Sequence, residues 1–219
     1  LADDRQVIVR VDRLEPTKNI VRGFLAYERL LAQHPELAST VRFLAFLVPS
    51  RQGLPLYRRY ERAVRKIVQR INSTSGTPDW QPITFFVDNN RPRALAAMRR
   101  YDVLLVNPII DGMNLVAKEG PLANARDGVV ILSRTAGAYE QLREAVLPVT
   151  PTDIEETADQ LYEALVMPAR ERRQRAELAR DIVRRETPAD WMRNQLSDAA
   201  EVRRAAAQRD RRKTLARAM

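Results

Sequence analysis

Two cationic side chains, Arg13 and Lys18, stand five residues apart where an apolar run gives way to a segment of helical period. A guanidinium can bind two phosphate oxygens at once, an ammonium adds a point charge, and the amides of a helix N-terminus attract anions. The pair therefore has the chemistry needed to hold a diphosphate. Taken alone, a surface arginine and lysine beside a helix cap is the simpler explanation.

A second group of polar residues begins with Asp111-Gly112, which ends a mostly apolar run. Gly112 would let the backbone turn toward a ligand, and Glu119 would fall on the helix that this loop opens. The amides that would then face the ligand belong to Met113, Asn114 and Leu115. Asp111 and Glu119 could accept hydrogen bonds from two sets of hydroxyls on one ligand, although a capping residue and a solvated helix acid would show the same spacing.

Two more arginines and one turn are weaker candidates. Arg51 follows another apolar run and could bind a second phosphate, while Arg91, in the polar segment 89–93, could contact a base or a sugar. A solvated loop arginine and an ordinary helix start are the alternatives. The small residues of the turn 133–138 would permit close approach of a ligand.

The composition limits the chemistry that the chain can perform. Its 219 residues contain no cysteine, which excludes disulfides, thiolate nucleophiles and cysteine zinc sites and agrees with a reducing cytoplasm. The single histidine, His34, argues against a Ser/His relay, and no stretch approaches the ~20 apolar residues of a membrane span. We therefore expect a cytoplasmic protein that does not enter a membrane and whose 45% hydrophobic residues can form a real core.

The net charge of +9 is concentrated near one end of the chain. Residues 203–219 hold six arginines and one lysine against the single acid Asp210. We interpret this basic tail as a solvated or frayed helix. Contact with nucleic acid through Arg203 to Arg217 is the less favoured alternative, because no aromatic residues are interleaved to stack on bases.

Short runs rich in Val, Ile, Leu and Phe alternate with longer segments of helical period, which is typical of a parallel sheet covered by helices on both faces. The expected strands are 7–11, 41–48, 83–87, 103–106, 129–132 and 146–149. The expected helices are 20–32, 56–71, 93–100, 115–123, 138–142 and 152–165, and the segment 73–78 is the clearest loop. The pattern predicts an α/β fold with one doubly wound, Rossmann-like sheet.

The chain becomes strongly helical and charged after Pro168, with one helix over 170–186 and another restarting at 187–190. We expect three parts: a ligand-binding domain over 1–168, terminal helices over 169–202, and the basic tail over 203–219. Because the first residue is not a methionine and a strand follows almost at once, we interpret the chain as a segment of a longer protein.

In open parallel sheets, ligands bind outside the carboxyl ends of the strands. Arg13 and Lys18 follow the first expected strand, Arg51 follows the second, and Asp111 to Asn114 follow the fourth. The three loops are therefore expected to converge on one edge of the sheet.

Over residues 7–196 the sequence resembles the carboxy-terminal half of the trehalose-6-phosphate synthases, which are retaining glycosyltransferases of the two-domain GT-B fold. The motifs that carry the resemblance are Asp12-Arg13-Leu14 with Lys18, Pro49-Ser50-Arg51, the run from Asn107-Pro108 to Asp111-Gly112-Met113-Asn114-Leu115-Val116-Ala117-Lys118-Glu119, and Leu132-Ser133 with Ala136-Gly137-Ala138. The long run is highly specific, and all the motifs occur in the same order and at the same sheet positions as in the family.

The resemblance implies transfer of glucose from a nucleotide diphosphate glucose, UDP- or GDP-glucose, to glucose 6-phosphate with retention of configuration. It implies that Arg13 and Lys18 hold the diphosphate and stabilise the leaving group, that Asp111 holds glucose hydroxyls, and that these three residues are catalytic. The other implied donor-binding residues are Arg91, Gly112, Met113, Asn114, Leu115, Val116 and Glu119, with Glu119 on the ribose. Arg51 would bind the acceptor phosphate. The scheme requires no metal or other cofactor, and a front-face transfer fits it better than double displacement by a carboxylate.

Some features depart from the family pattern. The family's first Rossmann domain, which supplies most acceptor contacts, is absent from these 219 residues, so we expect no turnover without that partner. Glu15-Pro16 and Asn19 stand where many relatives have Asp, an aromatic residue and Gly, which indicates a divergent branch. The identities of the donor base and of the acceptor therefore stay open. Whether the chain forms homo-oligomers also stays open. The alternatives are a synthase of glucosylglycerol phosphate, a pseudo-glycosyltransferase, and a non-catalytic nucleotide-sugar-binding or regulatory module.

Overall fold

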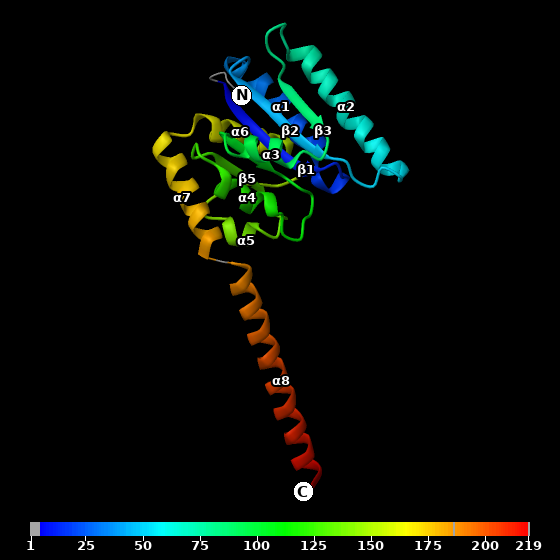
Figure 1. The fold of residues 1–219 in the computed structure, drawn as a ribbon, viewed down its shortest axis with the longest axis vertical. Coiled ribbons are helices and arrows are strands. Elements are labelled where there is room, and N and C mark those ends of the chain that lie inside the picture. The colour runs from blue at the N-terminus through cyan, green and yellow to red at the C-terminus, as the bar shows by residue number, and fades with distance from the viewer. Residues whose placement is uncertain (1–4, 186, 219) are drawn as a thin grey trace. The chain divides into compact units, whose positions relative to one another are not determined.

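A computed structural model describes residues 5–185 and 187–218, and its centre is a six-stranded parallel sheet in the order β3-β2-β1-β4-β5-β6 (Figure 1). The strands are β1 (Gln6–Arg13), β2 (Val41–Val48), β3 (Ile83–Val87), β4 (Val103–Val106), β5 (Val129–Ser133) and β6 (Leu147–Val149). Their near-continuous apolar sequences reflect burial on both faces. The expected α/β, doubly wound fold is confirmed.

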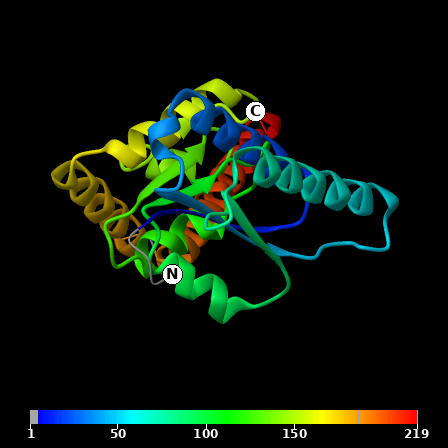
Figure 2. The same cartoon turned by 90° about the horizontal axis from the view of Figure 1, so that it is seen from above.

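Helices cover both faces of the sheet, as the view in Figure 2 shows. The helices are α1 (Ile20–Gln33), α2 (Pro55–Ser75), α3 (Arg91–Met98), α4 (Leu115–Ala123), α5 (Tyr139–Leu142), α6 (Ile154–Val166), α7 (Ala169–Arg185) and α8 (Pro188–Ala218), with short 3₁₀ helices η1 (Pro16–Lys18) and η2 (Pro35–Leu37). Helix α1 packs against α6 and α2 on one face, while α3 and α4 contact each other on the other.

The packing of α1 shows how the sequence pattern becomes a core. Ile20, Phe24 and Tyr27 are fully buried on one stripe of the helix, at the three- and four-residue spacing of an amphipathic helix. The ring of Phe43 on β2 meets Phe24 and Tyr27 edge to face, with ring centroids 5.2 and 5.4 Å apart. Because each such ring contributes about 1.5–3 kcal/mol when fully buried, this contact fixes α1 against the sheet and thereby fixes the loop that precedes it.

The strand order reverses beside β1. The chain runs outward from β1 to β2 and β3, then returns to place β4 on the other side of β1, pairing Ile8 with Val103. The loops after β1 and β4 therefore leave the sheet toward opposite faces and open a crevice between them, which is where doubly wound folds bind ligands.

One expected loop was wrong in part. The segment 73–78 is expected to be a loop between a helix ending near residue 71 and the next strand, yet α2 continues to Ser75. The side chain of Asn72 accepts a hydrogen bond from the Ile83 amide at 2.9 Å and donates to the Ile83 carbonyl at 2.8 Å, which ties the last turn of α2 to β3. Tertiary contacts therefore outweigh the low helix propensity of the Ser-Thr-Ser run.

The chain divides into two compact units, Leu1–Arg180 and Asp181–Met219, and the expected division at 168 and 202 stays a prediction. Within α8, Arg203 and Arg204 are exposed, whereas the side chains of residue 207 and of 209–219, most of the basic tail, lie outside the described residues. Among the described helices, none has the length and apolar character needed to cross a membrane.

Candidate functional site

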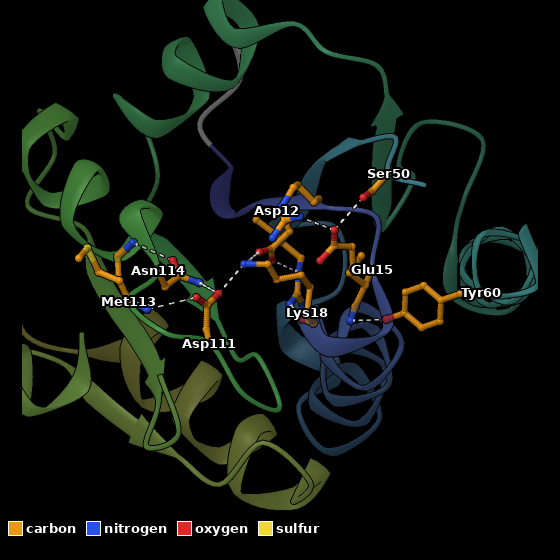
Figure 3. A network of polar contacts seen from close by, with 12 residues as sticks. Asp12, Glu15, Lys18, Ser50, Tyr60, Asp111, Met113 and Asn114 are labelled. Atoms are coloured by element: carbon orange, nitrogen blue, oxygen red, sulfur yellow. Dashed lines mark hydrogen bonds and ion pairs between the residues drawn. The ribbon is translucent and has the colours of Figure 1, made fainter. Parts of the chain in front are cut away.

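The loops after β1 and β4 meet through a charged contact between Lys18 and Asp111 (Figure 3). Lys18 is the last residue of η1, and its Nζ donates to Asp111 Oδ2 at 2.5 Å. A second carboxylate oxygen, Asp12 Oδ1, lies 3.7 Å from the same ammonium. Of the three loops expected to converge, those after β1 and β4 thus share one contact between residues 93 positions apart.

The Asp111 carboxylate is held from several sides. Met113 donates its amide to Oδ1 at 3.3 Å, and Asn114 Nδ2 donates to Oδ2 at 3.2 Å. Burial acts to raise the pKa of Asp111, but the hydrogen bond and charge of Lys18, with the two donors from the loop, lower the pKa below its ordinary value. Asp111 is therefore an ionised acceptor at neutral pH, suited to hydroxyl donors.

Asp12 forms the floor of the network. Its side chain is 4% exposed and accepts a hydrogen bond from Arg10 Nε at 2.9 Å. Burial raises the pKa of Asp12, against the opposing charges of Arg10 and Lys18. The roles of Arg10 and Asp12 were not expected from the sequence. The signal is present in the sequence, because Arg10 and Asp12 interrupt the run of apolar residues that begins at Val7.

Arg13 lies at the rim of this edge, with its side chain 57% exposed. Its Nη1 donates to Glu15 Oε1 at 2.5 Å, and Ser50 Oγ donates to the same oxygen at 2.7 Å. Glu15 is buried, so it acts as a fixed anchor between the β1 and β2 loops (Figure 3). In the sequence Glu15 stands out only as a departure from the family pattern, and its contact with Arg13 gives that departure a structural role.

Asn19, the other departure, has a left-handed backbone with φ of 59°. Its Nδ2 donates to the Asn107 carbonyl at 3.0 Å and to the Pro151 carbonyl at 2.6 Å. Asparagine tolerates this conformation better than other side-chain-bearing residues and here adds two bonds that glycine could not make. The loop that carries Lys18 is thereby tied to the loops after β4 and β6.

The turn at Asp111 to Asn114 differs in one detail from the expectation. The residue with positive φ is Asn114, at 72°, and not Gly112. Asn114 Oδ1 accepts the Ala117 amide at 3.2 Å and caps α4. A Cβ added to Gly112 would meet no atom within 4 Å, so Gly112 presents bare backbone to open space at the site.

The turn 133–138 supports this loop from behind. Gly137 donates its amide to the Asp111 carbonyl at 2.9 Å, and Ala138 donates to the Met113 carbonyl at the same distance. A Cβ on Gly137 would lie 2.0 Å from the Gly112 carbonyl oxygen. The close approach that the small residues permit is therefore between two loops of the protein.

Glu119 and Arg91 line a pocket of about 440 Å³ on the α3–α4 side of the sheet. Its floor is apolar and comes from β1 and β2, through Val11, Phe46 and Val48. Both charged side chains are exposed, Glu119 on α4 and Arg91 at the start of α3. A pocket of this size with an apolar floor can hold a flat heterocycle together with a sugar.

Three further expected residues, Arg51, Leu115 and Val116, neither line the pocket nor contribute a side-chain hydrogen bond to the Lys18–Asp111 network. Arg51 is exposed and left-handed, with φ of 44°, and its Nη1 donates to Tyr57 Oη at 3.3 Å. Leu115 is 60% exposed at the start of α4, and Val116 is partly buried. Within the described part of the chain, no group of three His, Cys, Asp or Glu side chains is arranged to hold a metal ion.

Comparisons with known proteins connect this geometry to a family. The sequence model of glycosyltransferase family 20 matches residues 1–201. The bifunctional trehalose-6-phosphate synthase/phosphatase of Thermoproteus tenax is 38% identical over 191 residues, which cover 85% of this chain and 26% of that protein.

Two solved structures have the same fold. An α,α-trehalose-phosphate synthase (UDP-forming) from Burkholderia xenovorans, in complex with glucose-6-phosphate, is 35% identical with a TM-score of 0.85, covering 89% of this chain and 44% of its own. A trehalose-6-phosphate structure from E. coli, bound with UDP-2-fluoro glucose, is 33% identical with a TM-score of 0.85 and the same coverages. The chain thus spans less than half the length of each of these relatives.

Proposed function

The chain belongs to glycosyltransferase family 20, and from this premise we propose that it supplies the donor-sugar site of a retaining trehalose-6-phosphate synthase. The observation that carries the proposal is the Lys18–Asp111 contact, because it brings a phosphate-binding cation and a hydroxyl-binding carboxylate to one point at the switch in strand order. A nucleotide sugar needs both groups within a few ångströms of each other.

In this proposal the diphosphate lies between Lys18 and Arg13. An ammonium has three donors, of which Asp111 takes one at 2.5 Å, so Lys18 can donate to a phosphate without leaving the carboxylate. Arg13 is exposed and can turn its free nitrogens to the ligand while Glu15 holds Nη1. Fixed cations at the point where the leaving group gains charge lower the transition state.

The sugar and the nucleoside lie on either side of the diphosphate. Asp111 accepts hydrogen bonds from glucose hydroxyls, beside the bare backbone at Gly112. The base occupies the α3–α4 pocket near Arg91, and Glu119, which also lines that pocket, accepts from the ribose. Asn114, Leu115 and Val116 follow the diphosphate along the start of α4. UDP-2-fluoro glucose in the E. coli relative supports a uridine donor, while GDP-glucose stays an alternative.

The acceptor is glucose 6-phosphate in this proposal, with Arg51 on its phosphate. The complex of the B. xenovorans enzyme with glucose-6-phosphate supports this choice. We assign no protein nucleophile, because this proposal places Asp111 on the glucose hydroxyls and Glu119 on the ribose. Transfer from the front face, in which the leaving phosphate takes the acceptor proton, fits this arrangement and needs no metal.

A second Rossmann-like domain completes the site in this proposal. Large apolar side chains on the loop after β4 and at the start of α4 are exposed at the same edge as Asp111, namely Ile110 at 67%, Met113 at 47% and Leu115 at 60%. Such side chains are typical of a surface that is covered in the complete protein. We assign residues 1–168 to the donor domain and residues 169–202 to helices that pack on or cross to that second domain, in a cytoplasmic enzyme.

The first test measures donor binding by calorimetry with UDP-glucose and GDP-glucose. The chain should bind one of them, and Arg13→Met should weaken binding about tenfold because one charge-assisted pair is lost. Arg70→Met is the matched control, since Arg70 pairs with Glu28 on the surface of α1 and α2. Equal affinity of Arg13→Met and the control would contradict the placement of the diphosphate.

The second test measures turnover after the chain is combined with the first domain of a relative, with the bound donor and glucose 6-phosphate. A phosphorylated disaccharide of retained configuration is expected by mass spectrometry and NMR. Product only with glycerol 3-phosphate would indicate the glucosylglycerol phosphate alternative. Donor binding without any product would indicate a non-catalytic binding module and would overturn the assigned reaction.

A further inference from the structure

Arg10 lies in the middle of β1 with its side chain fully buried. A buried guanidinium is strongly disfavoured unless its charge and its donors are satisfied, and an aliphatic residue would fill such a strand position at lower cost. The position of Arg10 therefore calls for an explanation beyond packing.

The guanidinium of Arg10 contacts Lys18 by two routes. Arg10 Nη2 donates directly to the Lys18 backbone carbonyl at 2.5 Å. Arg10 Nε donates to Asp12 Oδ2 at 2.9 Å, and the other oxygen of that carboxylate lies 3.7 Å from Lys18 Nζ. One buried side chain thus holds the backbone of Lys18 and, through Asp12, its ammonium.

Helix α1 provides the space for this arrangement. A Cβ added to Gly23 would lie 2.3 Å from Arg10 Nη1, so any larger residue there would displace the guanidinium. Among the described residues Nη1 has no hydrogen-bond partner, which leaves Nε and Nη2 as the two nitrogens that define its orientation. Both point to Lys18 or to the carboxylate beside Lys18.

We propose that Arg10 is a positioning residue that holds Lys18 at the point where its ammonium meets Asp111 and, on the proposed function, the donor diphosphate. Arg10 itself touches no ligand, because its side chain is fully buried. Its effect on donor binding passes through Lys18. Preorganised cations bind and stabilise charge better than mobile ones, since no ordering cost is met on binding.

The first measurement needs no ligand. Nitrogen-15 relaxation of the lysine ammonium groups should show Lys18 ordered and the exposed Lys66 mobile in the unmodified chain. Arg10→Met should make Lys18 as mobile as Lys66. Trp80→Phe is the control for a lost buried hydrogen bond far from the site, because Trp80 Nε1 donates to the Val41 carbonyl at 2.9 Å, and it should leave Lys18 ordered.

If Trp80→Phe disorders the Lys18 ammonium as much as Arg10→Met does, Arg10 acts only through global stability and the proposal is overturned. An unchanged order of Lys18 in Arg10→Met would overturn it as well. If Arg10→Met does not fold, judged by circular dichroism, Arg10→Lys replaces it. That variant keeps the charge but cannot donate to two acceptors from a planar fork, so it should lower Lys18 order partly.

The second measurement is a double-mutant cycle on UDP-glucose affinity. Arg10→Met should weaken binding about tenfold in the unmodified chain and have almost no effect when Lys18 is already Met. Additive losses in the double variant would overturn the proposal. If the unmodified chain binds neither UDP- nor GDP-glucose, the proposed function fails, while the relaxation measurement still decides the role of Arg10.

Discussion

The two regions assigned to the donor differ in how they are held together. The Lys18–Asp111 edge is a chain of charged contacts that begins at the buried Arg10 and ends at the Asp111 loop. The α3–α4 pocket has an apolar floor and two exposed charges, Arg91 and Glu119, on its walls. The charged edge is therefore ordered before a ligand binds, whereas the pocket contributes mainly apolar surface that the ligand buries. Changes at the edge should be severe and specific, and changes in the pocket mild.

The largest effect is expected from Lys18→Met. It removes the ammonium from between two carboxylates, leaves Asp111 and the buried Asp12 without that charge, and should weaken UDP-glucose binding about 100-fold. Calorimetry measures the change, with Lys66→Met on the surface of α2 as the matched control. A loss no larger than that of Lys66→Met would remove Lys18 from the site.

The next effect concerns the support behind the Asp111 loop. Gly137→Ala places a methyl group 2.0 Å from the Gly112 carbonyl oxygen, so the two loops must separate. We expect the free energy of unfolding to fall by about 1–3 kcal/mol, with donor affinity reduced as well. Urea unfolding checks the first quantity. Gly53→Ala is the control, because a Cβ there would meet no atom within 4 Å, and equal stability of the two variants would contradict the close packing.

A smaller effect is expected in the pocket. Leu95 lines the pocket and is 45% exposed. Leu95→Ala therefore removes only part of an apolar contact and should weaken the binding of UDP-glucose about fivefold. The same variant should leave the binding of inorganic diphosphate unchanged, whereas Lys18→Met should weaken the binding of both UDP-glucose and diphosphate. Leu54→Ala, at a position 49% exposed outside the pocket, is the control. Weaker diphosphate binding in Leu95→Ala would mean that the two regions are not separate.

The smallest effect is the pH dependence contributed by Asp111. Its pKa in the folded protein lies below the ordinary value of 3.8, so the folded state binds fewer protons than the unfolded state in that range. The stabilisation is complete above pH values near 3.8 and is lost as the pH falls through the lowered pKa of the folded protein.

Because Asp111 is partly exposed, solvent screening should hold this contribution to about 1 kcal/mol or less. Urea unfolding of the unmodified chain and of Asp111→Asn should therefore show a stability difference at pH 6 that shrinks toward pH 3. A stability difference that grows as the pH falls would contradict the lowered pKa of Asp111 in the folded protein. The raised pKa of Asp12 acts in the opposite direction, and the charge of Asp111 is one of its causes, so the difference between the two proteins reports Asp111 together with its effect on Asp12.

Part of the site could be predicted, because the order of strands and loops along the chain is enough to place its residues at one edge of the sheet. The apolar runs are long enough and regular enough to identify six strands, and the carboxyl ends of parallel strands must share one edge. Lys18 and Asp111 follow two such ends, so the contact between their loops could be anticipated. The extension of α2 through Ser75 could not, because it depends on the contacts between Asn72 and Ile83, 11 residues away.

Local sequence therefore determined the α/β class, the edge of the sheet at which polar residues gather, and the family to which the chain belongs. Only the tertiary structure decided how those residues are held: Lys18 between two carboxylates, Arg13 against Glu15, Asn114 rather than Gly112 in the left-handed turn, and Glu119 with Arg91 in a separate pocket. The physical reason is that periodicity reports which face of an element is buried, whereas hydrogen bonds and ion pairs depend on distances between residues that the chain alone leaves far apart.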